Sequence, residues 1–154
     1  MRAEMSAIAM VRSPRKDLAD DFWGAVEVEI VLDAAVDETA LFGLADFSHV
    51  EVLFLMHQVD PAKIETGARH PRARKDWPLV GIFAQRGKAR PNRIGLTRAT
   101  IVKVEGRVLT VRGLDAVDGT PVLDVKPWMD EFAPIGPTRQ PAWATELMRD
   151  YFKD

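Results

Sequence analysis

The chain has 154 residues, of which 47% are apolar and 29% charged, and its formal net charge is −2. This length suits one folded domain over residues 1–154, and this composition excludes disorder of the whole chain. Because it has no cysteine and only three histidines, disulfides and cysteine nucleophiles are excluded, and no metal site is expected. No apolar run reaches the roughly 18 to 20 residues of a membrane span, and no signal peptide is apparent, so we expect a cytoplasmic protein without a membrane partner.

The first sixty residues predict two strands with a short helix between them. Residues 24–32 (GAVEVEIVL) alternate apolar and polar side chains, the period of a half-buried strand in an antiparallel sheet. Asp37 is a suitable N-cap for a helix that would gather Leu41, Leu44 and Phe47 on one side. Residues 49–58 (HVEVLFLMHQ) are nearly continuously apolar in the middle, which predicts a central strand.

Residues 59–78 predict a long loop, because three prolines and Gly67 stand among polar and basic residues without an apolar period. A loop of this length in a compact domain is usually functional or disordered, and both readings stay open. From residue 69 to residue 98, nine Lys or Arg accompany a single acid, Asp76. Such a basic run can steer a polyanion to one face, and the alternative is a solvated, mobile loop.

The second half predicts four more strands, at residues 79–84, 99–104, 107–114 and 121–128. The spacer Glu105-Gly106 predicts a hairpin between the middle two strands. A turn at DAVDGT, residues 115–120, leads into the last strand. Strands at hairpin-like spacing favour a mainly β protein, a small antiparallel barrel with one or two short peripheral helices, over alternating βαβ units.

A C-terminal helix is predicted within residues 139–152. Pro141 can open it, and Trp143, Leu147 and Tyr151 recur every four residues. This apolar row would pack on the barrel or form an interface with a partner.

Three polar clusters border the predicted strands. His57-Gln58 ends a central strand, residues 85–95 (QRGKARPNRIG) can present arginines to carboxylate or phosphate, and Asp118-Gly119 makes a turn with exposed amides. Asp124 and Lys126 fall on one face of the strand that follows. A structural histidine, a basic hairpin loop and a surface ion pair are the alternatives. Without a serine or cysteine nucleophile, a transfer in which a cofactor carries the reactive group fits better than hydrolysis.

Four ordered motifs resemble the TrmO family of tRNA methyltransferases, also called YaeB or TsaA-like. They are MVRSPR at 10–15, FSHVEVLFLMHQ at 47–58, GIFAQRGKARPNRIGLTRATIVKVEG from residue 81 and LDAVDGTPVLDVKPW from residue 114, within a core of residues 7–132. The resemblance implies a β-barrel homodimer that binds S-adenosylmethionine and methylates N6 of threonylcarbamoyladenosine beside the tRNA anticodon. Composition and spacing do not indicate a methyl donor; the resemblance supplies it.

The resemblance also implies the residues of the site. The family's cofactor contacts correspond here to His57, Gln58, Arg86, Leu96, Val117, Asp118, Gly119 and Thr120, with a further segment around Asp20 to Phe22. We assign the anionic acceptor to Arg90, Asn92, Arg93 and Lys126. Asp118 or Asp124 is the candidate that takes the proton from nitrogen.

Two departures from the family leave the acceptor open. Arg93 replaces a proline of the family's RPNPIG, and Gln85 replaces the threonine before Arg86. We also expect a short form of the family, without the C-terminal domain of many bacterial members. The alternatives are a regulatory module that binds S-adenosylmethionine without catalysis, and a methyltransferase for another RNA or a small molecule.

Overall fold

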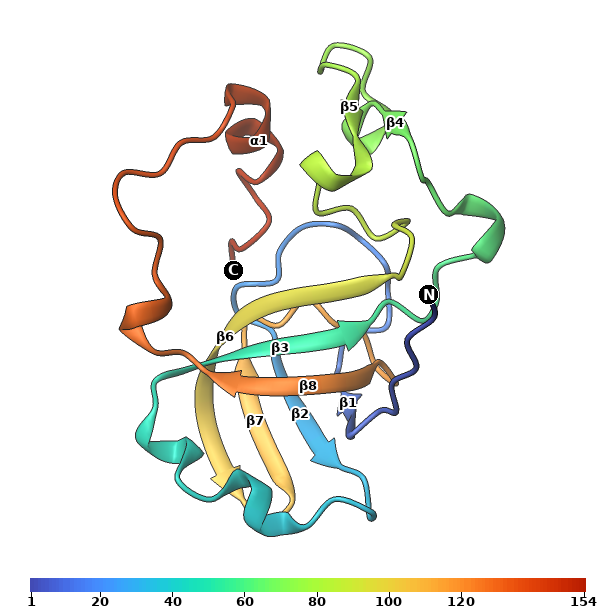
Figure 1. Ribbon diagram of the computed structural model, residues 1–154. Helices are drawn as coiled ribbons and strands as arrows, with labels where there is room; N and C mark the ends of the chain where they lie inside the picture. The colour runs from blue at the N-terminus through green and yellow to red at the C-terminus, as the bar shows by residue number, and fades with distance from the viewer.

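Six antiparallel strands close into a barrel in the order β1-β2-β7-β6-β3-β8, as the computed structural model of residues 1–154 shows (Figure 1). The strands are β1 Ala9–Arg12, β2 Glu27–Leu32, β3 His49–Leu55, β6 Ile94–Glu105, β7 Val108–Arg112 and β8 Pro121–Pro127. The predicted mainly β fold, an antiparallel barrel, is confirmed.

The barrel closes because alternate side chains of each strand are apolar and point inward. Val28, Ile30 and Leu32 of β2 are buried, and so are Val50 and Val52 of β3, while their neighbours remain partly or fully exposed. These side chains belong to a core cluster of 16 buried residues. Closure also pairs the strand edges that an open sheet would leave exposed.

The long connections gather at one end of the barrel, which we call the loop end. It carries the segments 13–26, 56–93 and 113–120, and most of segment 56–93 lies above the barrel in Figure 1. The opposite end carries residues 33–48, with the 3₁₀ helices η1 Glu38–Leu41 and η2 Leu44–Asp46, and the tight turn between β6 and β7.

The strand predicted at 79–84 is not part of the barrel. Only β5 Val80–Gly81 is extended, and it pairs with β4 Ala68–Arg69 in a separate two-stranded sheet before η5 Ile82–Ala84. Ile82 alone of this apolar run is buried, whereas Leu79 and Phe83 are 62% and 77% exposed. The barrel is completed instead by β1, a strand of four residues that the sequence pattern did not reveal.

The other local predictions need smaller corrections. Asp37 does cap a helix, since its Oδ1 accepts from the Thr39 amide at 2.9 Å, but the helix is a 3₁₀ turn. Gly43, with φ of 78°, separates it from η2. The hairpin turn is Gly106-Arg107 and lies one residue later than predicted, because Glu105 pairs with Val108.

Residues 59–78 are mostly turns that include η3 Pro61–Lys63 and η4 Pro71–Ala73. At the C-terminus, η6 Asp130–Phe132 precedes α1 Ala142–Leu147, which is much shorter than the helix predicted within 139–152. Tyr151 therefore lies in a turn beyond the helix. None of the helices has the length and apolar character needed to cross a membrane.

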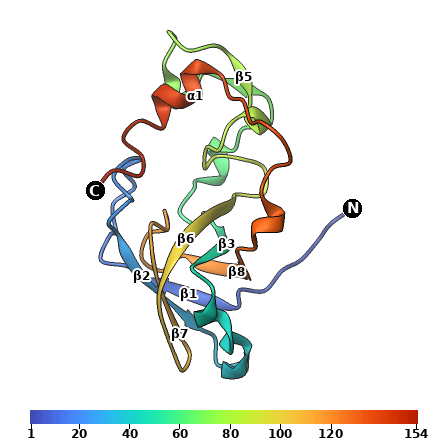
Figure 2. The same ribbon diagram turned by 90° about the vertical axis from the view of Figure 1, so that its left-hand side faces the viewer.

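The C-terminal segment, residues 139–154, returns to the loop end. The amides of Phe22, Trp23 and Gly24 donate to the carbonyls of residues 150, 151 and 153 at 3.0, 2.9 and 3.2 Å. In Figure 2, α1 lies beside β5, and the Trp77 indole donates to Glu146 of the helix at 2.8 Å. The segment thus covers the chain's own loops.

Replacing Gly95 with Ala is expected to destabilise the fold. A Cβ at this position would lie 2.3 Å from Cζ of Phe54, which is buried inside the barrel. Overpacking of this kind costs about 1 to 3 kcal/mol. Urea unfolding should show this loss, while Gly81→Ala, whose added Cβ meets nothing within 4 Å, should leave stability nearly unchanged. Equal stability of the two variants would contradict the packing of Phe54 on Gly95.

Candidate functional site

The barrel closes along a line of hydrogen bonds between β1 and the start of β8, which we call the seam. Ala9 pairs with Val122 and Met10 with Pro121. The contacts continue beyond β8, since the Val11 amide donates to the carbonyl of residue 120 and the amide of residue 119 donates to the Val11 carbonyl, both at 2.9 Å. The seam therefore shapes the turn at 117–120.

Asp118 is part of this seam. Its Oδ1 accepts from the Ser13 amide at 3.0 Å, and its own amide donates to the Arg15 carbonyl at 3.0 Å. Two of the motifs, MVRSPR and DAVDGT, are thus held together by backbone contacts. One carboxylate oxygen of Asp118, a candidate base, is therefore occupied by a hydrogen bond within the fold.

His57 and Gly119 face each other at the loop end. His57 follows β3 and is half-buried, and a Cβ built on Gly119 would lie 4.0 Å from His57 Nε2. Gly119 adopts a φ of 77°, which a side chain would strain. Gln58 is exposed in the next turn, and Val117 and Thr120 are buried beside Gly119. The structure thus brings the first and third polar clusters together.

Arg86 and Leu96 also meet at this end. The Arg86 guanidinium donates to the Leu96 carbonyl, and the Leu96 side chain is 41% exposed near the start of β6. This contact brings part of the second cluster to the strand that pairs with β3.

A partly buried hydrogen-bond network involving Asp115 lies next to these contacts, and the sequence did not single it out. Thr97, the residue after Leu96, donates to Asp115 Oδ1, and the Tyr151 hydroxyl donates to Oδ2. Burial and the negative charge of Asp115 raise the pKa of Tyr151. Asp115 stood inside the DAVDGT string, but Tyr151 looked like part of a helical apolar row, so no sequence signal connected them.

The loop that carries Phe22 is organised by Arg15. The guanidinium donates to the carbonyls of Ala19, Asp21 and Phe22 at 2.7, 2.9 and 3.0 Å, and it stacks 3.6 Å from the centre of the Trp23 ring. Phe22 itself has a φ of 66° and is 56% exposed. The fixed loop leaves an aromatic side chain open to solvent.

Part of the basic run is paired with acids, three of them distant in the sequence. Arg72 forms two hydrogen bonds with Asp21, at 2.6 and 3.0 Å, and these raise the pKa of Arg72. Lys88 lies 3.4 Å from Asp20. Four of the nine basic residues form ion pairs with carboxylates: Arg72, Arg74, Lys88 and Arg98. The long loop is therefore attached to segment 13–26 and is neither structureless nor simply a solvated cationic surface.

The residues assigned to the acceptor occupy different positions. Arg90 Nη1 donates to the Gln85 carbonyl at 3.0 Å, and Arg93 Nη1 to the Val59 carbonyl at 3.4 Å. Asn92, between them in sequence, is exposed. These three flank the loop end, and each arginine retains further N–H donors.

Asp124 and Lys126 lie on β8 away from the turn at 117–120. They form an ion pair with each other at 3.0 Å, and Lys126 is opposite Glu51 in the sheet register. Asp124 Oδ1 also accepts from the amide of residue 125 at 3.0 Å. The structure does not bring these two residues together with His57 or Arg86.

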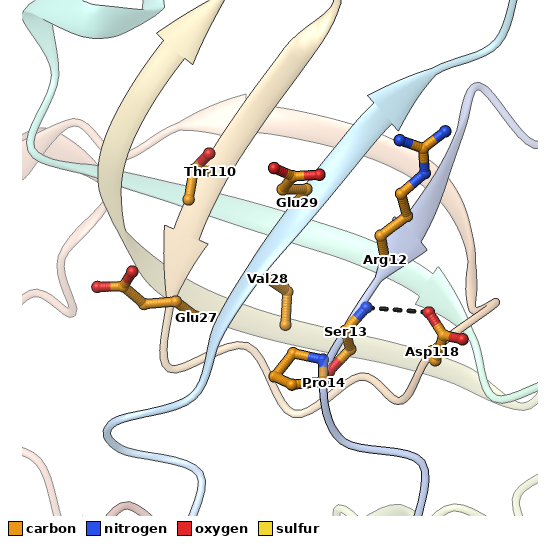
Figure 3. A pocket seen from close by; sticks show the side chains of 8 residues that line it. All are labelled: Arg12, Ser13, Pro14, Glu27, Val28, Glu29, Thr110 and Asp118. Atoms are coloured by element: carbon orange, nitrogen blue, oxygen red, sulfur yellow. Dashed lines mark hydrogen bonds between the residues drawn. The ribbon is translucent and has the colours of Figure 1, made fainter.

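An open depression of about 600 Å³ lies on the outer face of β1, β2 and β7 (Figure 3). Its charged walls are compensated, since Arg12 is opposite Glu29 and Glu27 lies 2.7 Å from Arg112. Of the predicted cofactor contacts it contains only Asp118. No group of three or more His, Asp or Glu side chains is arranged to hold a metal ion.

The strand order and the converging loops define a small closed antiparallel β-barrel with a polar site at one end. The family model described as the tRNA-methyltransferase O N-terminal domain matches residues 13–133, and the chain belongs to this family.

Relatives of two kinds are similar to the chain. The tRNA (adenine(37)-N6)-methyltransferase of Mus musculus is 41% identical over 95 residues, which cover 62% of this chain and 22% of that protein. A probable S-adenosyl-L-methionine-binding protein of Methanothermobacter thermautotrophicus is 33% identical over 141 residues, which cover 88% of this chain and 97% of that protein. The chain thus spans about a fifth of the mouse relative and nearly all of the archaeal one.

The fold also matches solved structures. The crystal structure of TrmO from Pseudomonas aeruginosa superposes with a TM-score of 0.73 at 31% identity, covering 90% of this chain and 61% of that one. The six-stranded barrel is therefore the architecture of this family.

Replacing Arg15 with Lys is expected to loosen residues 19–24. Lysine keeps the charge but cannot fork onto three carbonyls, and losing a charged hydrogen bond costs about 1.5 to 3 kcal/mol. Amide exchange in this segment should become roughly tenfold faster, since about 1.4 kcal/mol corresponds to a factor of ten. Hydrogen–deuterium exchange measures it, with Arg2→Lys as the control because the Arg2 side chain is 87% exposed. Unchanged exchange at residues 19–24 would show that Arg15 does not hold the loop.

Proposed function

We propose that this chain is an S-adenosylmethionine-dependent methyltransferase that methylates N6 of threonylcarbamoyladenosine in tRNA, next to the anticodon. The observation that carries the proposal is convergence: His57, Arg86 and the turn at 117–120 are far apart in the sequence and lie around one end of the barrel. The names of the mouse and archaeal relatives support the acceptor and the cofactor, respectively.

The residues at the loop end fit the chemistry of S-adenosylmethionine. The half-exposed side chains of Leu96 and Phe22 offer apolar surface for a purine ring. The Val117 amide donates to no carbonyl of the chain, so it is available to a ring acceptor. Gly119 leaves space in front of the His57 imidazole, which a side chain would reduce.

The bound cofactor would supply an activated methyl group, and the chain's own residues would align the reactants. Arg86, fixed to the Leu96 carbonyl, retains donors for a carboxylate. His57, Gln58, Val117, Asp118, Gly119 and Thr120 are the other proposed contacts. Of the two candidate bases, Asp118 has one oxygen bonded to Ser13 and the other available for a proton.

The acceptor is proposed to approach along the loop that carries Arg90, Asn92 and Arg93. A tRNA anticodon loop presents phosphates, and threonylcarbamoyladenosine adds a carboxylate, so both suit guanidinium groups. Lys126 and Asp124, paired with each other on β8, would act only on a more distant part of such a large substrate.

The remaining proposals concern the context of the domain. We propose that residues 1–154 form a single barrel domain, that it acts as a homodimer, and that it works in the cytoplasm. The continuous hydrophobic core supports the first. The exposed Leu79 and Phe83 support the second, because they offer apolar surface to a second copy. A tRNA substrate supports the third.

Isothermal titration with S-adenosylmethionine tests the cofactor site. The Arg86→Ala variant should bind about tenfold more weakly, because it loses a charged hydrogen bond. Lys75→Ala is a matched control, since it removes the same charge from an exposed position of the neighbouring loop. Equal affinities of wild type and Arg86→Ala would show that Arg86 does not contact the cofactor.

Methyl transfer tests the acceptor. The protein is incubated with labelled S-adenosylmethionine and tRNA that contains threonylcarbamoyladenosine, and the digested nucleosides are analysed by mass spectrometry. The expected product is that nucleoside with one added methyl group. Cofactor binding without transfer to any tRNA would instead favour the regulatory module. Transfer to a different nucleoside or to a small molecule would show that the acceptor is not threonylcarbamoyladenosine.

A further inference from the structure

The Asp115 carboxylate is held by neutral groups. Thr97 Oγ1 donates to one oxygen and the Tyr151 hydroxyl donates to the other. In contrast, Asp20 and Asp21 at the same end bind Lys88 and Arg72. Hydroxyl donors fix a carboxylate at a defined position without forming an ion pair with it, and Asp115 forms no ion pair with a basic side chain.

Tyr151 is well suited to act as the donor. Its burial, together with the nearby charge of Asp115, raises the pKa of its hydroxyl, which therefore stays protonated near neutral pH. The ring comes from the C-terminal segment, whose backbone is bonded to residues 22–24. The side chain is thus held at both ends, by its backbone and by its hydroxyl.

The carboxylate lies near one proposed cofactor contact, because the guanidinium charge of Arg86 is close enough to Tyr151, the hydroxyl partner of Asp115, to offset part of the rise in the pKa of Tyr151. Asp115 is two residues before Val117, and its partner Thr97 directly follows Leu96, to which Arg86 is bonded. Asp115 is only half-buried, so a ligand can approach it. In such a partly desolvated position a fixed charge acts more strongly on a ligand than it would in bulk water.

We propose that Asp115 selects for a positively charged ligand group at this site, the sulfonium of the methyl donor over the neutral thioether of the product, and that Tyr151 positions it. This inference rests on the proposed function. A fixed negative charge attracts a sulfonium cation and has no such attraction for a thioether, so methyl transfer weakens binding of the spent cofactor. Asp115 thereby favours exchange of product for a fresh donor.

Tyr151 lies beyond the residues that match the family model, which end at residue 133. The positioning role therefore belongs to a segment outside the matched domain. Asp115 and Thr97 lie within that domain, and the tyrosine completes the set of donors on the carboxylate.

The test is calorimetric titration of S-adenosylmethionine and S-adenosylhomocysteine into the full chain and its Asp115→Asn variant. The variant removes the charge with little change of shape. Its affinity for the sulfonium ligand should fall about tenfold, while that for the thioether changes by less than about twofold. The control Asp46→Asn removes the same charge from an exposed position at the opposite end and should leave both affinities unchanged.

A second variant separates positioning from folding. Tyr151→Phe keeps the ring and removes only the hydroxyl. It should lower the ratio of the affinity for S-adenosylmethionine to that for S-adenosylhomocysteine about threefold. A purely structural role would lower both affinities alike and leave their ratio unchanged, and this result would overturn the inference. Equal changes for the two ligands in Asp115→Asn would overturn it as well, with the proposed function intact. If the wild type binds neither ligand, the proposed function fails together with the inference.

Discussion

The seam between β1 and β8 is the constraint on which the rest of this structure depends. It converts a curled sheet into a closed barrel, and the register of β1 against residues 118–122 also fixes the turn that follows β7. The same hydrogen bonds therefore close the core and shape the proposed binding surface. This double role explains why two motifs far apart in the sequence, MVRSPR and DAVDGT, are one feature in space.

The loop end is held together by charge pairing as well as by buried apolar side chains such as Trp23, Trp77 and Ile82. Arg15 bonds to the carbonyls of its own loop, and Arg72 and Lys88 bind Asp21 and Asp20. These pairs give hydrogen-bond partners to polar groups that would otherwise have none. They also keep the region polar, which suits a charged ligand. The cost is that fewer cations remain free for a polyanion than the sequence suggests.

The fold was predictable where a local pattern decides the structure. The alternation of apolar and polar residues identified β2, the turn at residues 115–120 marked the start of β8, and Asp37 marked a cap. The strand predicted at residues 79–84 was wrong, because this apolar run lies in a two-stranded sheet and a 3₁₀ helix outside the barrel. The contacts of Asp115 with Tyr151 could not be predicted, because they depend on where the C-terminal segment lies, and short sequence patterns carry no such long-range information.

The seam has a consequence for how the protein is made. Ser13 and Asp118 are 105 residues apart in the chain, so β1 leaves the ribosome well before its second partner exists. At about 5 to 20 residues per second, this interval lasts about 5 to 20 seconds. During that time, one edge of β1 is unpaired and open to other nascent strands. The barrel thus closes late in synthesis, and until then its N-terminal strand is the edge most open to mispairing.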